Sequence, residues 1–248
     1  MVTITILGSG KVAHHLIANI LDSDQLHLQQ IYARNTNSVT DLVPESIVVH
    51  DMAQLQPADI FIIAVSDSAI EEVSASIPLA NQFVVHTSGT IPMSALKLER
   101  RGVLYMLQSF TKEKEVDFTS IPFCIEANHK EDFQLLERIA VSFSERVYKI
   151  SSEQRKAIHL AAVFVNNFTN HMFTLGEEVC KEHQVPFEIL KPLIAETANK
   201  IMELSPVEAQ TGPASRGDQN TINQHLTLLT DSTKKEIYQL ITKSIQNR

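Results

Sequence analysis

The sequence predicts an α/β fold with a parallel sheet in its first part, followed by an all-α part. Short β-rich runs alternate with helical patterns through the first 150 residues, which is typical of a parallel sheet wrapped by helices. From Ser151 onward only helical periodicity remains, and no strand-like alternation returns. We therefore expect two domains, residues 1–150 and residues 151–248.

The strands of the first domain are predicted from short apolar runs that end at turn residues. The run at residues 60–65 is almost continuously apolar, as expected of a strand that is buried on both faces of a sheet. The expected strands, in chain order, are residues 2–7, 26–33, 46–50, 60–65, 83–86, 103–108, 121–127 and 147–150. We expect them to form one sheet, with the last two runs extending it to its edge.

Three helices are predicted between these strands. Apolar residues recur at helical spacing from Val12 to Leu21. The stretch Ser66-Asp67-Ser68 is expected to cap a helix that stops at Pro78. A third helix is expected at residues 130–146.

The second domain is predicted to consist of helices. Ser151 and Gln154 have the spacing of a capping box at the start of a long helix. One apolar stripe along that helix is formed by Ile158, Ala161, Val165, Phe168, Met172, Leu175 and Val179. The elements expected after it are a helix at residues 187–204, a loop at residues 205–217, a helix capped by Asp218 and a last helix opened by Ser232.

The composition argues against several classes of protein. The 248 residues carry 21 Lys and Arg against 29 Asp and Glu, and this net charge of −8 argues against a broad surface for nucleic acid or anionic lipid. No apolar run approaches the roughly 18 residues that span a bilayer, and no signal peptide is recognised. Cys124 and Cys180 have neither metal nor disulfide-framework spacing. We expect a cytoplasmic protein with a small-molecule substrate and with no metal, nucleic acid or membrane partner.

A glycine turn between the first strand and the first helix predicts a nucleotide site. The G-x-G-x-x-G/A pattern of Rossmann-like domains is met by Gly8, Ser9, Gly10, Lys11, Val12 and Ala13. In this pattern the glycines allow a tight turn and close approach of a pyrophosphate, which the N–H groups of the helix N-terminus then bind. A Walker loop is excluded, because it would need Gly in place of Thr5 and Ser or Thr in place of Val12. The alternative is a purely structural turn.

The end of the second strand favours NADP over NAD. About 20 residues beyond the glycine turn, NAD-binding domains usually carry an Asp or Glu that holds the ribose hydroxyls. This sequence has Arg34 and Asn35 there. Arginine can pair with a 2′-phosphate through a charge-assisted contact, and Asn35 adds a neutral donor. We therefore predict NADP as the cofactor; the alternative is that Arg34 is an ordinary surface arginine.

Beyond this pattern, the chain resembles the superfamily of pyrroline-5-carboxylate reductase, deazaflavin-dependent NADP reductase and the 6-phosphogluconate dehydrogenase-like enzymes. The resemblance is carried by the glycine turn, by Tyr32-Ala33-Arg34-Asn35 and by the run Ala-Asp-Ile-Phe-Ile-Ile-Ala-Val-Ser-Asp at residues 58–67. It implies that the nicotinamide side of the cofactor is lined by Val65, Ser66 and Asp67.

A closer resemblance is to a family with a Rossmann-like N-terminal half and a helical C-terminal half of unknown function. Its marks here are the segments at residues 86–89, 107–110, 160–168 and 211–218. This resemblance implies an α/β Rossmann-like parallel sheet domain followed by an all-α C-terminal domain, similar to that of 6-phosphogluconate dehydrogenase.

Four polar residues are candidates for catalysis. His86 and Ser88 follow a strand that should end at the cofactor crevice, where a histidine could act as acid or base. Asn167 lies in the middle of the long helix beside a second asparagine, which lowers helix propensity and indicates a specific role. Arg216 is a bidentate cation in an irregular loop. The structural alternatives are turn stabilisation for the first two, helix packing for Asn167 and a contact with Asp218 for Arg216.

Together these features predict an NADP-dependent oxidoreductase that transfers hydride between the nicotinamide and a small substrate bound between the two domains. One alternative is a non-catalytic NADP-binding or redox-sensing protein, and another is a structural module that binds no nucleotide. The apolar stripes of the helical domain further predict a homodimer formed through it.

Overall fold

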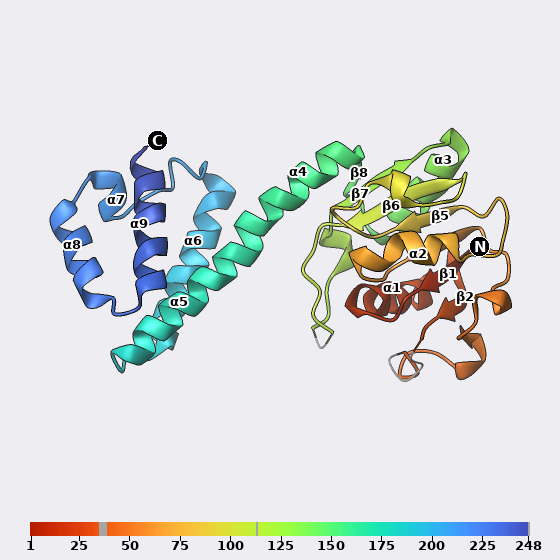
Figure 1. Cartoon of the computed structure of the whole chain (residues 1–248), viewed down its shortest axis with the longest axis horizontal. Coiled ribbons are helices and arrows are strands. Elements are labelled where there is room, and N and C mark those ends of the chain that lie inside the picture. Colours follow the sequence, from red (N-terminus) through yellow and green to blue (C-terminus); the bar gives the residue numbers. More distant parts are fainter. Residues whose placement is uncertain (35–38, 113, 248) are drawn as a thin grey trace. The chain divides into compact units, whose positions relative to one another are not determined.

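An eight-stranded sheet dominates the first part of the chain, and helices make up most of the rest (Figure 1). The computed structural model describes residues 1–34, 39–112 and 114–247. The chain divides into two compact units, here called the sheet unit (Met1–Asn166) and the helical unit (Asn167–Arg248). The predicted class, a Rossmann-like α/β part followed by an all-α part, is confirmed.

The sheet has the doubly wound topology in which the chain fills first one side of β1 and then the other. Its strands are β1 (Val2–Leu7), β2 (Leu26–Tyr32), β3 (Val48–Val49), β4 (Ile60–Ile63), β5 (Val84–His86), β6 (Arg101–Met106), β7 (Phe123–Ala127) and β8 (Val147–Lys149). Their order is β3-β2-β1-β4-β5-β6-β7-β8, and all neighbours are parallel except β6 and β7. Because the order reverses between β1 and β4, a crevice for a ligand is expected at the carboxyl ends of these two strands.

All eight predicted strands are present, although several are shorter than expected. The third keeps only Val48 and Val49, because Glu45–Ile47 form a 3-10 turn behind Pro44. The sixth begins earlier than predicted, at Arg101, and ends at Met106. The residues that remain in these strands are almost all buried.

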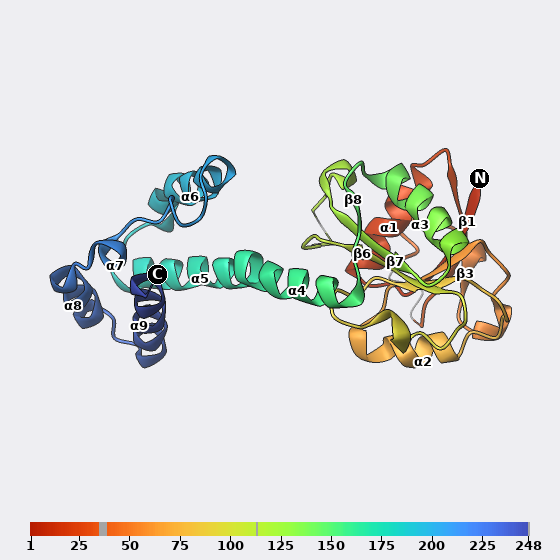
Figure 2. The ribbon, with the colours of Figure 1, turned by 90° about the horizontal axis from the view of Figure 1, so that it is seen from above.

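Helices cover both faces of this sheet (Figure 2). Helices α1 (Lys11–Leu21) and α3 (Lys130–Phe143) pack on one face, where Ile60 and Ile62 of β4 join their core. Helix α2 (Ile70–Ala75) packs on the opposite face with Phe61 and Ile63. Successive residues of β4 therefore point into different layers, as its continuous apolar run predicts.

The predicted cap of the second helix is wrong in its details. Asp67–Ala69 form a 3-10 turn before α2, and the side chain of Ser66 makes no capping hydrogen bond. Helix α2 also ends at Ala75, three residues before Pro78. The turn after β4 is closed by a backbone hydrogen bond, from the N–H of Ala69 to the carbonyl of Ser66, and the Ser66 side chain is not needed as a cap.

The predicted capping box of α4 (Ser152–Ala162) is confirmed, but the long helix is interrupted. The N–H of Gln154 donates to Ser151 Oγ at 3.2 Å, and the N–H of Ser151 donates to Gln154 Oε1 at 3.0 Å. A π-helical segment, Val163–Phe168, then separates α4 from α5 (Thr169–Glu182). Such segments are rare and often mark functional sites in helices.

The remaining helices agree with the prediction except within the expected loop. They are α6 (Lys191–Glu203), α7 (Pro213–Arg216), α8 (Gln219–Leu228) and α9 (Ser232–Gln246). Asp218 caps α8 as predicted, whereas α9 is capped by Asp231 in front of Ser232. The prediction of an unbroken loop at residues 205–217 is wrong, because Pro213 starts a one-turn helix that Gly217, at φ +69°, ends.

The helical unit buries little apolar surface within one chain. Among its described residues, only Ala214 and Ile222 are buried hydrophobic side chains. Its large exposed apolar residues are Phe168, Phe173, Val185, Ile189, Leu193, Ile201, Met202, Leu204, Val207, Leu228, Leu240 and Ile241. None of the helices in the described ranges is long and apolar enough to cross a membrane.

Candidate functional site

A cleft of about 700 Å³ opens at the carboxyl ends of β1, β2, β4 and β5. It therefore lies at the place where the strand order reverses. The side chains and backbone that line it come from Gly8, Ser9, Gly10, Lys11, Val12, Tyr32, Ala33, Arg34, Met52, Ala64, Val65, Ser66, Ala69, Glu72, Val73, Ser76 and Thr87.

The two glycines of the turn have different geometries. Gly8 has φ +134°, and a Cβ atom there would lie 2.3 Å from the carbonyl oxygen of Ala64. Its N–H donates to the Tyr32 carbonyl at 2.9 Å, so the turn is fastened between β2 and β4. A Cβ atom on Gly10 would meet no described heavy atom within 4 Å, so the space beside this residue is open to a ligand. Packing thus requires Gly8, whereas Gly10 leaves room in the cleft.

The first turn of α1 has no side-chain cap and no negative charge. Gly10 is its N-cap residue and offers no side chain to the free N–H groups, and the turn carries no acidic residue. Lys11 is exposed at the same end. Ala13 is fully buried, and it packs in the core under the turn instead of lining the cleft. Its small size lets the helix lie close to the sheet.

Arg34 is exposed where β2 leaves the sheet, on the edge of the cleft. The backbone there is shaped by His50, whose Nδ1 lies 2.9 Å from the Ala33 carbonyl. Asn35 lies outside the residues that the structure describes. Sequence reasoning missed Met52 and Glu72 in this cleft; their only signal is that they follow the third and fourth strands.

At the other end of the cleft, Val65, Ser66 and Thr87 follow β4 and β5. The predicted neighbour Asp67 is exposed, and its Oδ2 accepts a hydrogen bond from Thr90 Oγ1 at 2.6 Å. Asp67 therefore ties the turn after β4 to the loop after β5. The structure places Thr87, which the sequence did not single out, on the cleft itself.

Ser88 is buried and shapes the loop after β5. Its Oγ accepts hydrogen bonds from the N–H groups of Thr90 at 3.1 Å and Ile91 at 3.0 Å. Such a side-chain to backbone arrangement replaces the hydrogen bonds that a regular element would supply.

His86, at the end of β5, is fully buried. Its Nδ1 accepts a hydrogen bond from the Ser88 N–H at 3.2 Å. Burial lowers the pKa of His86 to about 4, and the nearby positive charge of Arg155 acts in the same direction. The ring is consequently neutral at pH 7, with its proton on Nε2.

The other two catalytic candidates belong to the helical unit. Asn167 is exposed and lies in the π-helical segment. Arg216 is exposed at the end of α7 and lines a hollow of about 600 Å³ together with Gln210 and Ser215. Asp218, which the sequence groups with Arg216, is used as a helix cap: its two carboxylate oxygens accept hydrogen bonds from the N–H and Oγ1 of Thr221. These hydrogen bonds lower the pKa of Asp218.

Two family models match the chain. One, described as a domain of unknown function (DUF2520), matches residues 121–245, and the other, described as NADP oxidoreductase, coenzyme F420-dependent, matches residues 3–89. No curated protein is similar enough to the chain to count as a relative.

Solved structures with a similar fold cover almost the whole chain. A "putative NADP oxidoreductase" from Bacteroides fragilis is 41% identical, with a TM-score of 0.89 over 100% of this chain and 98% of that one. A protein from Thermotoga maritima is 19% identical, with a TM-score of 0.79 over 99% and 100%. Pyrroline carboxylate reductase from Plasmodium falciparum, solved with NADP bound, is 10% identical, with a TM-score of 0.62 over 99% and 98%. The last two similarities show the fold alone.

Proposed function

The chain belongs to the family that joins an NADP-oxidoreductase Rossmann domain to the DUF2520 domain, and on that premise we propose that it is an NADP-dependent oxidoreductase. It would transfer hydride between the nicotinamide and a small substrate. One observation carries the proposal: the glycine turn, the N-terminal end of helix α1, whose N–H groups have no side-chain cap, and Arg34 all line a single cleft.

The residues of the cleft fit NADP from end to end. The open space beside Gly10 and the free N–H groups of α1 suit a pyrophosphate. Arg34 suits the 2′-phosphate, and Val65, Ser66 and Thr87 suit the nicotinamide end. Bound NADPH would supply the hydride, while the protein orients the cofactor and excludes water.

Roles for the remaining candidates follow from their surroundings. Ser88 and His86 enter the proposal as residues that hold the turn at the end of β5, because Ser88 Oγ and His86 Nδ1 accept hydrogen bonds from the loop itself. Asn167 and Arg216 are exposed polar groups and are proposed to contact the substrate. In this proposal residues 1–150 bind NADP, and residues 151–248 serve the substrate and dimerisation.

The cofactor assignment is tested by replacing Arg34. We expect wild-type protein to bind NADPH more tightly than NADH, and Arg34→Asp to weaken NADPH binding by about 10- to 100-fold, the size of one lost charge-assisted contact. Arg138→Asp is the matched control, since Arg138 is exposed on α3 and not among the cleft residues. Titration of cofactor fluorescence measures all three. Equal or tighter binding of NADH, or unchanged NADPH affinity in Arg34→Asp, contradicts the assignment.

A non-catalytic NADP-binding or redox-sensing role is the second candidate, and one observation favours it. Ser88 and His86 are both buried, and neither is among the residues that line the cleft, so neither is placed to give a proton to a substrate there. Oxidation of NADPH is therefore measured against a panel of imines, keto acids and aldehydes. Tight binding without turnover across the panel favours the second candidate over the oxidoreductase.

We also propose that the helical unit forms a homodimer. Leu193 is 62% and Met202 81% exposed on α6, and large exposed apolar patches mark interaction surfaces. We expect a solution mass of twice 27.8 kDa, and at least about a tenfold weaker dimer for Leu193→Glu, because an interfacial carboxylate must lose its hydration. Leu21→Glu, on the sheet unit, is the control. Sedimentation that shows wild-type monomer at every concentration refutes this proposal.

A further inference from the structure

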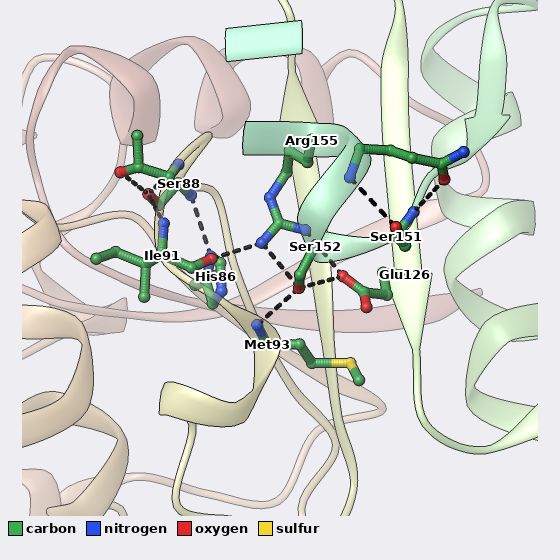
Figure 3. Close-up of polar contacts among 10 residues, drawn as sticks. His86, Ser88, Ile91, Met93, Glu126, Ser151, Ser152 and Arg155 are labelled. Atoms are coloured by element: carbon green, nitrogen blue, oxygen red, sulfur yellow. Dashed lines mark hydrogen bonds and ion pairs between the residues drawn. The ribbon is translucent and has the colours of Figure 1, made fainter. Parts of the chain in front are cut away.

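The first turn of α4 holds a buried arginine against the sheet. Arg155 is only 1% exposed, and its Nη1 donates to Glu126 Oε2 on β7 at 2.9 Å. Its Nη2 donates to the carbonyl of Ile91, in the loop after β5, and to Ser152 Oγ at 3.3 Å. One guanidinium thus joins a strand, a helix and a loop (Figure 3).

Ser152 fastens the same loop a second time. Its Oγ donates to Glu126 Oε2 at 2.7 Å and accepts a hydrogen bond from the Met93 N–H at 3.1 Å. The backbone of the loop is therefore held at both Ile91 and Met93 by the start of α4 (Figure 3).

The next turn of α4 touches the loop at Gly89. A Cβ atom on Gly89 would lie 2.5 Å from His159 Nδ1, so a larger residue there would displace the His159 ring. His159 Nδ1 in turn lies 3.2 Å from the hydroxyl of Tyr105 on β6. Because Arg155 and His159 are four residues apart, they face the loop from one side of the helix.

The loop held in this way borders the nicotinamide end of the cleft. It follows Thr87, which lines the cleft, and its turn is fixed by Ser88. Thr90 then bonds to Asp67, the neighbour of the cleft residue Ser66. Polar contacts therefore run from Glu126 through α4 and the loop to the cleft.

We propose that Arg155 is a positioning residue for the nicotinamide end of the cleft; this inference rests on the proposed function. A buried ion pair contributes little net stability, because desolvation of the charges offsets their attraction. Among the described residues, moreover, Arg155 Nε has no hydrogen-bond partner. The guanidinium instead fixes the geometry of its surroundings. Its planar N–H donors hold the Glu126 carboxylate on β7 and the Ile91 carbonyl of the loop in fixed relative positions.

The test compares NADPH with 2′,5′-ADP, which carries the 2′-phosphate and adenosine but no nicotinamide. In Arg155→Met we expect affinity for NADPH to fall about tenfold, because the loop beside the nicotinamide end is no longer held in place, and affinity for 2′,5′-ADP to stay within about twofold. The fluorescence enhancement of saturating NADPH should also shrink toward that of the free cofactor. Lys156→Met, an exposed neighbour on α4, is the matched control and should leave both ligands unchanged.

Two further variants keep the test decisive if Arg155→Met does not fold. Ser152→Ala removes the contact to Met93 and should move the NADPH readouts in the same direction by a smaller factor. Arg155→Lys keeps the charge without the planar fork and should give an intermediate loss. Equal loss of both ligands, or no change in the NADPH readouts of a folded variant, overturns the inference. Wild-type protein that binds neither ligand overturns the proposed function, and the inference with it.

Discussion

Replacement of Gly8 by alanine is expected to destabilise the protein by at least about 2 kcal/mol and to abolish NADPH binding. The new methyl group would lie 2.3 Å from the Ala64 carbonyl oxygen, in a backbone conformation with φ +134° that L side chains rarely adopt. Strain of this kind costs roughly 1 to 3 kcal/mol, and overpacking adds a similar amount. Chemical denaturation measures the loss of stability, and cofactor fluorescence measures binding.

Gly10→Ala is the matched control for this prediction. Nothing in the described structure lies within 4 Å of a Cβ atom at Gly10, so only the poorer N-cap propensity of alanine counts and stability should stay within about 1 kcal/mol of wild type. NADPH binding should nevertheless weaken, because the methyl group fills the space in which a pyrophosphate approaches the turn. A Gly8→Ala protein as stable as wild type contradicts the geometry of the turn. A Gly10→Ala protein with unchanged NADPH affinity contradicts the site.

Acidification from pH 7 to pH 4.5 is expected to remove about 2 kcal/mol of stability through His86 alone. The pKa of His86 is about 4 in the folded protein, against an ordinary value of 6.5. Between pH 4 and pH 6.5, the His86 side chain binds a proton in the unfolded chain but not in the folded chain. Stability therefore rises with pH across this window and is lost as the pH falls below 6.5.

Comparison with His86→Asn isolates this contribution from that of the carboxylates. Asparagine can accept the hydrogen bond from the Ser88 N–H but binds no proton in this range. We compare the unfolding free energies of wild type and His86→Asn, measured by urea denaturation at each pH. The difference, wild type minus variant, should fall by about 2 kcal/mol between pH 7 and pH 4.5. A difference that does not depend on pH would show that His86 is not held neutral by burial.

The elements of the sheet unit could be predicted because their signals are local. Strand β4 is a short apolar run that is covered by helices on both faces. The glycine turn marks the point where the first strand ends and the first helix begins. The errors arose where short-range backbone geometry decides the outcome. Ser66 offers a capping side chain that a 3-10 turn leaves unused, and Pro213 starts a helix too short to show periodicity. The π-helical segment, likewise, has no signature in a pattern based on 3.6 residues per turn.

The cleft could be predicted in part, and the support behind it could not. Most residues chosen from the sequence as cofactor-binding line the cleft, because strand ends and a glycine turn fix their position along a parallel sheet. Among the described ones, two do not: Ala13 is buried below the turn, and Asp67 bonds to Thr90. The catalytic candidates His86 and Ser88 are buried and do not line the cleft either. Arg155 had no signal at all, since an arginine in a polar first helical turn is usually solvent-exposed. Its burial depends on Glu126 and Ile91, which are distant in the chain.

The described part of the helical unit has only two buried apolar residues, Ala214 and Ile222. Its stability is therefore expected to depend on the protein concentration. In the dimer that we propose, the second copy supplies most of the burial, so apparent stability falls by about 1.4 kcal/mol for each tenfold dilution. Low expression would then leave this part open to proteolysis even with an intact sequence. Abundance itself would act as a threshold for function.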